Sequence, residues 1–188
     1  ISMDPKNYDR LIEIYEALAA HGYREVGQEY LQNVLDTAKQ LDAYDSGRIY
    51  YYLGEYQKAY LALDEARDKG GADSYLYLGR AYAATGDYNY ASSVYNNYLS
   101  KQGPNAEIYN ELGLCEMAKK EYQNALAAFQ AGKQIEGNSL MQTLCFNEIV
   151  AYEYLEDYQQ AEVLMNAYLQ NYPDDQTAIR EQQFLSTR

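Results

Sequence analysis

Hydrophobic and polar positions alternate along this chain at the spacing of paired amphipathic helices. Within residues 75–99, large side chains stand at Tyr75, Leu78 and Tyr82, and a second set follows the turn at 85–88. Offsets of three, four and seven residues place such side chains on one face of a helix. The segment therefore predicts two amphipathic helices that fold back on each other at a short turn.

The same two-helix unit recurs along the chain. A tyrosine follows the turn of each copy, at spacings of 33, 32, 34 and 36 residues: Tyr23, Tyr56, Tyr88, Tyr122 and Tyr158. Three positions later stand Val26, Ala59, Ala91, Ala125 and Ala161. Four positions after these stand Tyr30, Leu63, Tyr95, Phe129 and Met165. Small residues such as Gly79 and Ala91 let helix backbones approach closely, and the large side chains fill the flanks.

A period near 34 residues with two helices per copy resembles the tetratricopeptide repeat, over nearly the whole chain. The match is best where Leu78-Gly79 and Leu112-Gly113 occupy the same place in two copies. The resemblance implies an all-α fold, a right-handed superhelical solenoid of antiparallel helix pairs. We predict one domain over 1–188, with a leader at 1–6, repeats at 7–39, 40–71, 72–105, 106–139 and 142–175, and a capping helix at 176–188. Ile14 stands where the internal repeats have glycine, which indicates either a shifted frame or an atypical terminal repeat.

The charge of the chain restricts its partners. Fifteen Lys and Arg against 28 Asp and Glu give a net charge of −13, which argues against a nucleic-acid or anionic-membrane partner. No apolar run approaches the roughly 20 residues of a membrane span. The chain opens Ile1-Ser2-Met3, so the lack of a visible signal peptide carries little weight. Only 3 prolines agree with a nearly all-helical chain.

The sequence offers little material for catalysis, and we predict a protein that is not an enzyme and holds neither cofactor nor metal. His21 is the only histidine and lies in a predicted turn, away from any nucleophile that it could activate. Cys115 and Cys145 lie on first helices of adjacent repeats, where reduced thiols act as small hydrophobic residues. A disulfide between them is the alternative, and it would imply an oxidising compartment.

The resemblance also implies where a ligand would bind. Family ligands usually contact positions 2, 5, 9, 12 and 13 of each repeat, which line a concave groove. In the first repeat these positions are Tyr8, Leu11, Tyr15 and Leu18. From the later repeats we select as candidate ligand-binding residues Tyr44, Arg48, Tyr51, Tyr52, Arg80, Asn110, Leu114, Met117, Phe146, Val150 and Tyr154.

Arg48 and Arg80 hold equivalent places one repeat apart, and arginine and tyrosine are enriched in binding hot spots. The two arginines would anchor acidic or carbonyl groups of a ligand. In the alternative, they pair with Asp45, Asp73 or Glu111 along the groove.

Two functions fit these observations. The first is a non-catalytic module that binds a peptide or protein segment in the groove. The second is a structural component, self-associating end to end or forming part of a larger cell-envelope or cytoplasmic complex. Members that bind chaperone tails use a basic clamp, and no run of three repeats supplies it here. A chaperone's C-terminal carboxylate is therefore a disfavoured ligand.

Overall fold

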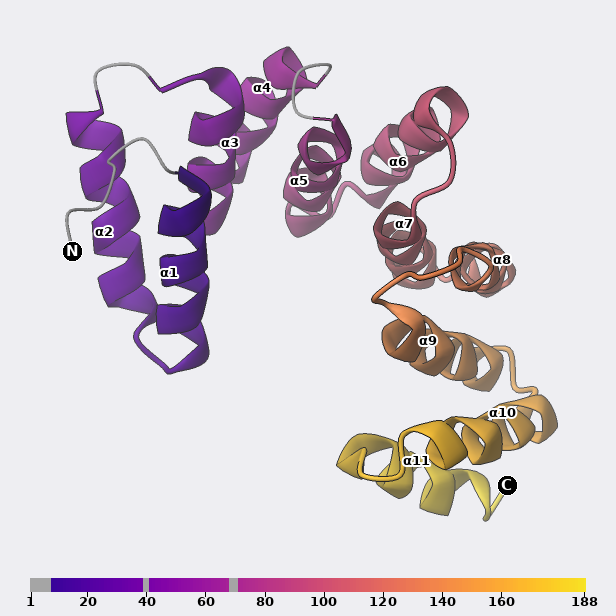
Figure 1. The fold of residues 1–188 in the computed structure, drawn as a ribbon. Helices are drawn as coiled ribbons and strands as arrows, with labels where there is room; N and C mark the ends of the chain where they lie inside the picture. The colour runs from indigo at the N-terminus through magenta and orange to yellow at the C-terminus, as the bar shows by residue number, and fades with distance from the viewer. Residues whose placement is uncertain (1–7, 39–40, 68–70) are drawn as a thin grey trace. The chain divides into compact units, whose positions relative to one another are not determined.

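The structure is a computed structural model that describes residues 8–38, 41–67 and 71–188, so the predicted leader at 1–6 lies outside the described residues. The described residues form eleven α-helices and no strand (Figure 1). The chain divides into two compact units, Ile1–Gly86 and Asp87–Arg188, which we describe separately. The first unit contains α1 (Tyr8–Ala20), α2 (Arg24–Thr37), α3 (Ala43–Tyr52), α4 (Tyr56–Ala66) and α5 (Gly71–Ala84). The second contains α6 (Tyr88–Gln102), α7 (Ala106–Ala118), α8 (Tyr122–Lys133), α9 (Met141–Tyr154), α10 (Tyr158–Asn171) and α11 (Gln176–Leu185).

The helices follow the predicted repeats along the sequence. One pair of helices corresponds to each of the five predicted repeat ranges, although α5 and α9 begin one residue before theirs, and α11 lies in the predicted capping segment. The all-α class is therefore confirmed, as a fold of helical repeats. Within the described ranges, no helix is both long and apolar enough to cross a membrane.

The turns inside the helix pairs fix the register of the repeats. In each of these turns one residue has a positive φ: Gly22, Gly54, Gly86, Lys120 and Glu156. Two residues later stand Arg24, Tyr56, Tyr88, Tyr122 and Tyr158. The first-repeat equivalent of Tyr56 is thus Arg24 and not Tyr23, whose side chain is 60% exposed. The predicted frame was wrong by one residue in the first repeat.

In the corrected register, the contact between α1 and α2 has its large residue on the first helix and its small residue on the second. Gly27 and Leu31 are the buried residues of α2, whereas the predicted Val26 is 54% exposed. Tyr15 stands where the second repeat has Gly47, and a Cβ on Gly27 would lie 2.8 Å from the Tyr15 ring. Close packing of two helices needs a small residue on at least one side of the contact. In the first repeat this small residue is Gly27, on the second helix.

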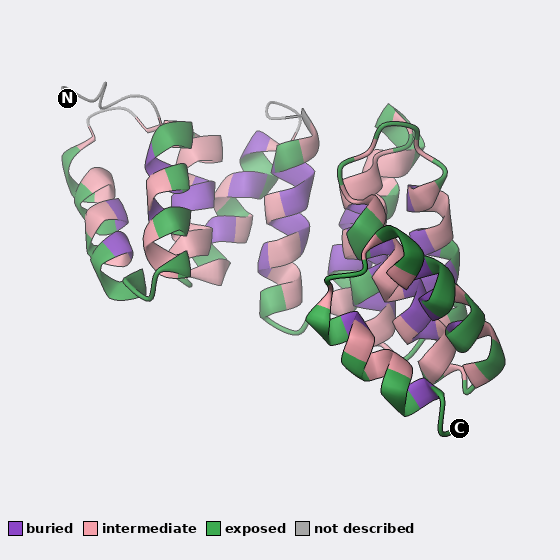
Figure 2. Ribbon diagram, turned by 60° about the horizontal axis from the view of Figure 1, so that its bottom comes forward, coloured by how far each residue is buried: buried purple, intermediate pink, exposed green. Residues whose placement is uncertain are grey.

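In two later repeats the close approach lies where the sequence predicts it, on the first helix of the pair. A Cβ on Gly47 would lie 2.5 Å from Cγ of Leu63, and one on Gly113 would overlap the ring of Phe129. Leu63 and Phe129 are fully buried. Within each unit, buried residues gather where neighbouring helices face each other, and the outward faces are exposed (Figure 2).

Lys120 adopts the left-handed conformation, with φ 64°, that glycine takes in the turns of the first unit. A side chain in this region costs roughly 1–2 kcal/mol. We expect Lys120→Gly to relieve this strain and to raise the free energy of unfolding by about 0.5–1 kcal/mol. The gain is smaller than the strain itself, because glycine also increases the conformational entropy of the unfolded chain. Glu121→Gly is the control, since Glu121 has φ −90° and should give no gain. Urea unfolding measures both, and a destabilised Lys120→Gly protein would contradict the strain.

The capping helix α11 packs on the preceding pair. Its Ala178 and Leu185 join a buried cluster with Ile149, Met165 and Tyr168. Asp175 begins the helix, because its Oδ1 accepts hydrogen bonds from the amides of the two residues 177 and 178. This N-cap satisfies amides that a helix start leaves open.

Two carboxyl groups meet between α9 and α11. Burial raises the pKa of Glu153 to about 7, and the charge of Glu181 and a hydrogen bond with its carboxyl group add to the shift. Oε1 of Glu153 is buried and has no hydrogen-bond partner. The pair therefore favours a protonated Glu153 in the folded chain.

This pair predicts that acidity stabilises the second unit. Between pH about 4.5 and about 7 the folded chain keeps a proton on Glu153 that the unfolded chain has lost, so stability falls as pH rises. We expect Glu153→Gln to remove this slope and to raise the melting temperature at pH 8. Melting curves from pH 4.5 to 8 test it, with Glu162→Gln, at an exposed position on α10, as the control. An unchanged slope would contradict the raised pKa of Glu153.

Candidate functional site

The first helices of the first unit bring together aromatic and charged side chains that lie far apart in the sequence. Five of these residues lie on α3, and four of the five interact with residues of α1 or α5. We call this surface the tyrosine face and define it by Asp9, Glu16, Tyr44, Asp45, Arg48, Tyr51, Tyr52, Asp73, Tyr77 and Arg80. It contains all five candidate residues that the sequence analysis placed in this unit.

Arg48 is held by two carboxylates. Its Nη1 donates to Oδ1 of Asp9 at 2.6 Å, and its Nη2 donates to Oδ1 of Asp45 at 2.5 Å. The guanidinium lies 4.2 Å from the ring centroid of Tyr44, and the side chain is only 7% exposed. Burial alone would lower the pKa of Arg48, but the hydrogen bonds with Asp9 and Asp45 outweigh it and raise the pKa. Arg48 is therefore in the paired state that the sequence left open as an alternative.

The tyrosine rings of this face contact one another. The Tyr51 ring lies 5.3 Å from that of Tyr52 and 5.6 Å from that of Tyr77, both edge to face. The Tyr52 hydroxyl donates to Oε1 of Glu16 at 2.5 Å and lies 3.1 Å from the Tyr77 hydroxyl. Burial, followed by the hydrogen bond with Glu16, raises the pKa of Tyr52, so its hydroxyl remains a donor. The edge-to-face ring contacts and the hydrogen bonds of the hydroxyl groups hold these three tyrosines in one arrangement.

Tyr44 connects α3 to α5, because its hydroxyl donates to Oδ2 of Asp73 at 3.4 Å. On α5 itself, the Arg80 guanidinium lies 6.0 Å from the ring centroid of Tyr77. Arg48 and Arg80 thus both lie against a tyrosine ring, which agrees with their equivalent repeat positions.

Sequence reasoning missed the acidic members of this face in the first repeat. It expected Tyr8, Leu11, Tyr15 and Leu18 there, but Leu11 and Tyr15 are each only 4% exposed. The corrected register places Asp9 and Glu16 at positions 2 and 9 instead. The turn glycines Gly22, Gly54 and Gly86, each 32 residues apart, carried the signal that could have set this frame.

The second unit presents a more apolar surface on α7 and α9. Leu114 and Tyr154 are 43% and 58% exposed, and the Tyr154 ring stacks on that of Tyr122 at 5.0 Å. Asn110 is buried and accepts a hydrogen bond from the Asn147 amide at 2.9 Å, which joins the two helices.

The three other candidate residues of this unit are partly buried. Phe146 packs 5.7 Å from the ring of Tyr168, and Met117 packs against the cluster around Phe129. Val150 is half-buried. Leu114 and Tyr154 are therefore the members whose apolar surface is most open to a ligand.

Comparison with known proteins identifies the repeat. A family model described as tetratricopeptide repeat matches residues 44–91 and 78–138, which together make up just over half of the chain. The chain belongs to the tetratricopeptide repeat family. No curated protein sequence gives a significant match.

Solved tetratricopeptide repeat structures share the fold at low sequence identity. A thermophilic tetratricopeptide repeat protein of Thermus thermophilus aligns with a TM-score of 0.72 at 16% identity, over 96% of this chain and 100% of that one. YrrB, described as having an unusual peptide-binding site, aligns with a TM-score of 0.64 at 16% identity, over 95% and 99%. The second such domain of human RPAP3, solved with the HSP70 peptide SGPTIEEVD, aligns with a TM-score of 0.56 at 17% identity, over 63% and 97%. These likenesses show the fold.

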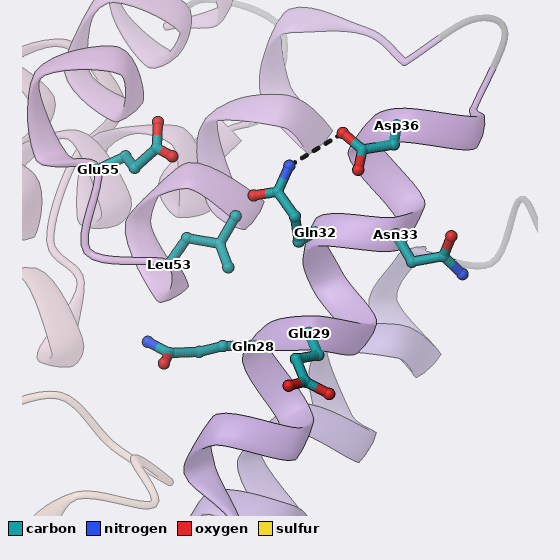
Figure 3. Close-up of a pocket in the computed structure, with 7 residues that line it drawn as sticks. All are labelled: Gln28, Glu29, Gln32, Asn33, Asp36, Leu53 and Glu55. Atoms are coloured by element: carbon teal, nitrogen blue, oxygen red, sulfur yellow. Dashed lines mark hydrogen bonds between the residues drawn. The ribbon is translucent and has the colours of Figure 1, made fainter.

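A second surface of the first tetratricopeptide repeat lies along α2. It is an open polar pocket of about 410 Å³, and Gln32 in it donates to Asp36 at 3.0 Å (Figure 3). Its lining is Gln28, Glu29, Gln32, Asn33, Asp36, Leu53 and Glu55. It contains no aromatic ring, and within the described ranges no three His, Cys, Asp or Glu side chains gather closely enough to hold a metal ion.

His21, Cys115 and Cys145 are the titratable residues that the sequence analysis considered for catalysis. His21 is exposed in the first turn, and its Nδ1 lies 2.8 Å from the carbonyl oxygen of Ala17. Both cysteines are free thiols, Cys115 buried and Cys145 half-buried. Burial, with the charges of Glu111 and Glu116, raises the pKa of Cys115 to about 12, which keeps it as an unreactive thiol.

Proposed function

We propose that this chain is a non-catalytic interaction module that holds a peptide or protein segment on the tyrosine face. Its family supports a role in protein–protein interaction, and the human domain and YrrB supply examples in which the same fold binds peptides. The proposed contacts lie on first helices, where family ligands usually bind.

The cluster of half-buried tyrosines carries the proposal. Tyr44, Tyr51, Tyr52 and Tyr77 are each partly exposed, and their rings or hydroxyls are already fixed by neighbours. Tyrosine provides a large contact area for little loss of side-chain entropy and keeps a polar end for hydrogen bonds. Because the rings are ordered before binding, a ligand gains their contacts at a small entropic cost.

The second unit would contribute apolar contacts of its own. We propose that Leu114 and Tyr154 contact apolar side chains of a bound segment. Met117, Phe146 and Val150 support them, and the bond between Asn110 and Asn147 holds α7 and α9 together. A small number of such residues usually carries most of the binding energy.

The experiment selects peptides from a random display library with the folded chain and measures their affinity by fluorescence polarisation. We expect Tyr51→Ala with Tyr77→Ala to weaken binding at least about tenfold, because each buried ring contact is worth around 1 kcal/mol or more. Tyr90→Ala, at a 45% exposed tyrosine on the second helix α6, is the matched control. Equal losses in both variants, with helicity intact by circular dichroism, would contradict the site.

A structural role is the second candidate. Large hydrophobic side chains are exposed on second helices, including Val26 at 54%, Leu61 at 68% and Val163 at 58%. Scattered exposed residues of this kind are common on monomers, so this observation is the weaker one. Light scattering decides: mass that rises with concentration favours assembly, and a constant monomer mass favours the first proposal.

A further inference from the structure

A pocket opens beside the tyrosine face, where the end of α3 meets α1 and the start of α2. Its volume is about 340 Å³. Four tyrosines line it, together with one carboxylate and one guanidinium: Tyr15, Tyr51, Tyr52, Tyr56, Glu16 and Arg24. The remaining lining is small or amide-bearing.

The rings form a continuous wall. Tyr15 lies 5.0 Å from Tyr52, Tyr52 lies 5.3 Å from Tyr51, and Tyr51 lies 5.9 Å from Tyr56, measured between ring centroids. The Tyr52 hydroxyl donates to Glu16, so this carboxylate is held at the edge of the aromatic surface. Aromatic faces beside a carboxylate attract organic cations.

The accessible charge on the tyrosine face is negative. Its carboxylates are Asp9, Glu16, Asp45 and Asp73, and its guanidinium groups are Arg48 and Arg80. The Arg48 side chain is 7% exposed, whereas that of Asp9 is 77% exposed. A ligand would therefore meet the exposed Asp9, Glu16 and Asp73 before Arg48, which is buried and already paired.

We propose that the tyrosine face takes a lysine- or arginine-bearing segment, with one cationic side chain in the pocket against Tyr51 and Tyr52 and paired with Glu16. This inference rests on the proposed function and specifies the chemistry of its partner. It differs from the acidic peptide bound by the human RPAP3 domain, and it follows from the acidic groups that the corrected register places on α1.

Arg24 supplies an internal check, because it is the cation among the pocket's lining residues and its side chain is exposed. It repels a bound cation and attracts a bound anion. Its removal should therefore strengthen binding of a basic probe, whereas removal of Glu16 should weaken it.

The test titrates the folded chain, with ¹³C-labelled tyrosine rings, with N-acetyl-arginine amide and, separately, with N-acetyl-glutamate amide. We expect the arginine probe to shift the Tyr51 and Tyr52 ring signals saturably and the glutamate probe to leave them unchanged. Glu16→Gln should weaken the arginine probe about fivefold and Arg24→Ala should strengthen it about twofold, as expected for charge contacts near a surface. Glu13→Gln, on the exposed side of α1, should change nothing.

Glutamine at position 16 keeps an acceptor for the Tyr52 hydroxyl, so the aromatic wall should persist, and unchanged tyrosine signals without probe confirm this. The inference would be overturned if the glutamate probe shifted the tyrosine signals more than the arginine probe does. It would also be overturned if Glu16→Gln left the affinity for the arginine probe unchanged. The proposed function is judged separately: library peptides that bind the tyrosine face but are acidic would sustain it and reject the basic partner.

Discussion

Gly113→Ala should cost this chain about 3 kcal/mol of unfolding free energy, at the upper end of overpacking effects. Its Cβ would overlap the ring of Phe129, which is fully buried. Alanine gains about 1 kcal/mol over glycine inside a helix, so the clash must exceed this gain. Urea unfolding followed by circular dichroism measures the difference.

Gly132→Ala is the matched control for this substitution. Gly132 is also a buried helical glycine, but its Cβ would meet Leu144 methyl carbons at 3.0–3.1 Å, and these can shift by a rotamer change. We expect its effect to be within about 1 kcal/mol of zero, because the propensity gain offsets the contact. Adding Phe129→Leu to Gly113→Ala should restore part of the loss. Equal effects at the two glycines would contradict close packing at Gly113.

Arg48→Ala should destabilise the chain by about 2 kcal/mol, because it leaves a partly buried carboxylate without its cation. The Asp45 side chain is 17% exposed and would lose its bond to Nη2, and Tyr44 would lose the guanidinium stacked on its ring. The loss should shrink at pH 4, since burial already raises the pKa of Asp45 and an unpaired Asp45 protonates more readily. Unfolding in urea at pH 7 and pH 4 measures both effects.

Two further variants separate geometry from charge at this position. Arg48→Lys keeps the charge but has no planar fork to bond Asp9 and Asp45 together, so we expect an intermediate loss. Arg67→Ala removes an arginine whose pair with Asp64, three residues back, is more exposed, and it should cost less than about 0.5 kcal/mol. A loss at Arg48 no larger than at Arg67 would show that the buried pair contributes little.

The fold was predictable because the repeat encodes it several times. Gly47 and Gly113 mark close helix contacts that the structure contains, and each repeat range corresponds to one helix pair. The error in the first repeat has a physical cause. Arg24 occupies the place of the turn tyrosine in the first repeat, so aligning Tyr23 with the other turn tyrosines shifted the frame by one residue. Backbone conformation at Gly22 gives the correct frame.

The candidate site was predictable in position but not in its pairing. Equivalent repeat positions identified Tyr44, Arg48, Tyr51 and Tyr52, because a helix of known register displays them on one side. Whether an arginine meets a ligand or a neighbouring carboxylate depends on distances of a few ångströms between helices. Asp9 is 39 residues from Arg48 in the sequence, and only the packing of α1 beside α3 brings them to 2.6 Å. Because the predicted frame of α1 was wrong by one residue, the sequence analysis placed Tyr8 and not Asp9 on this face and missed the pair.

The central claim is that ligands bind on the first helices of the first unit, at the tyrosine face. Photo-crosslinking tests it most directly: a library-selected peptide carrying a benzophenone group is irradiated with the chain, and the linked residues are located by mass spectrometry. We predict links to α1, α3 and α5, concentrated near Tyr51, Tyr52 and Tyr77. Links confined to α2 and α4, with none on the tyrosine face, would contradict the account.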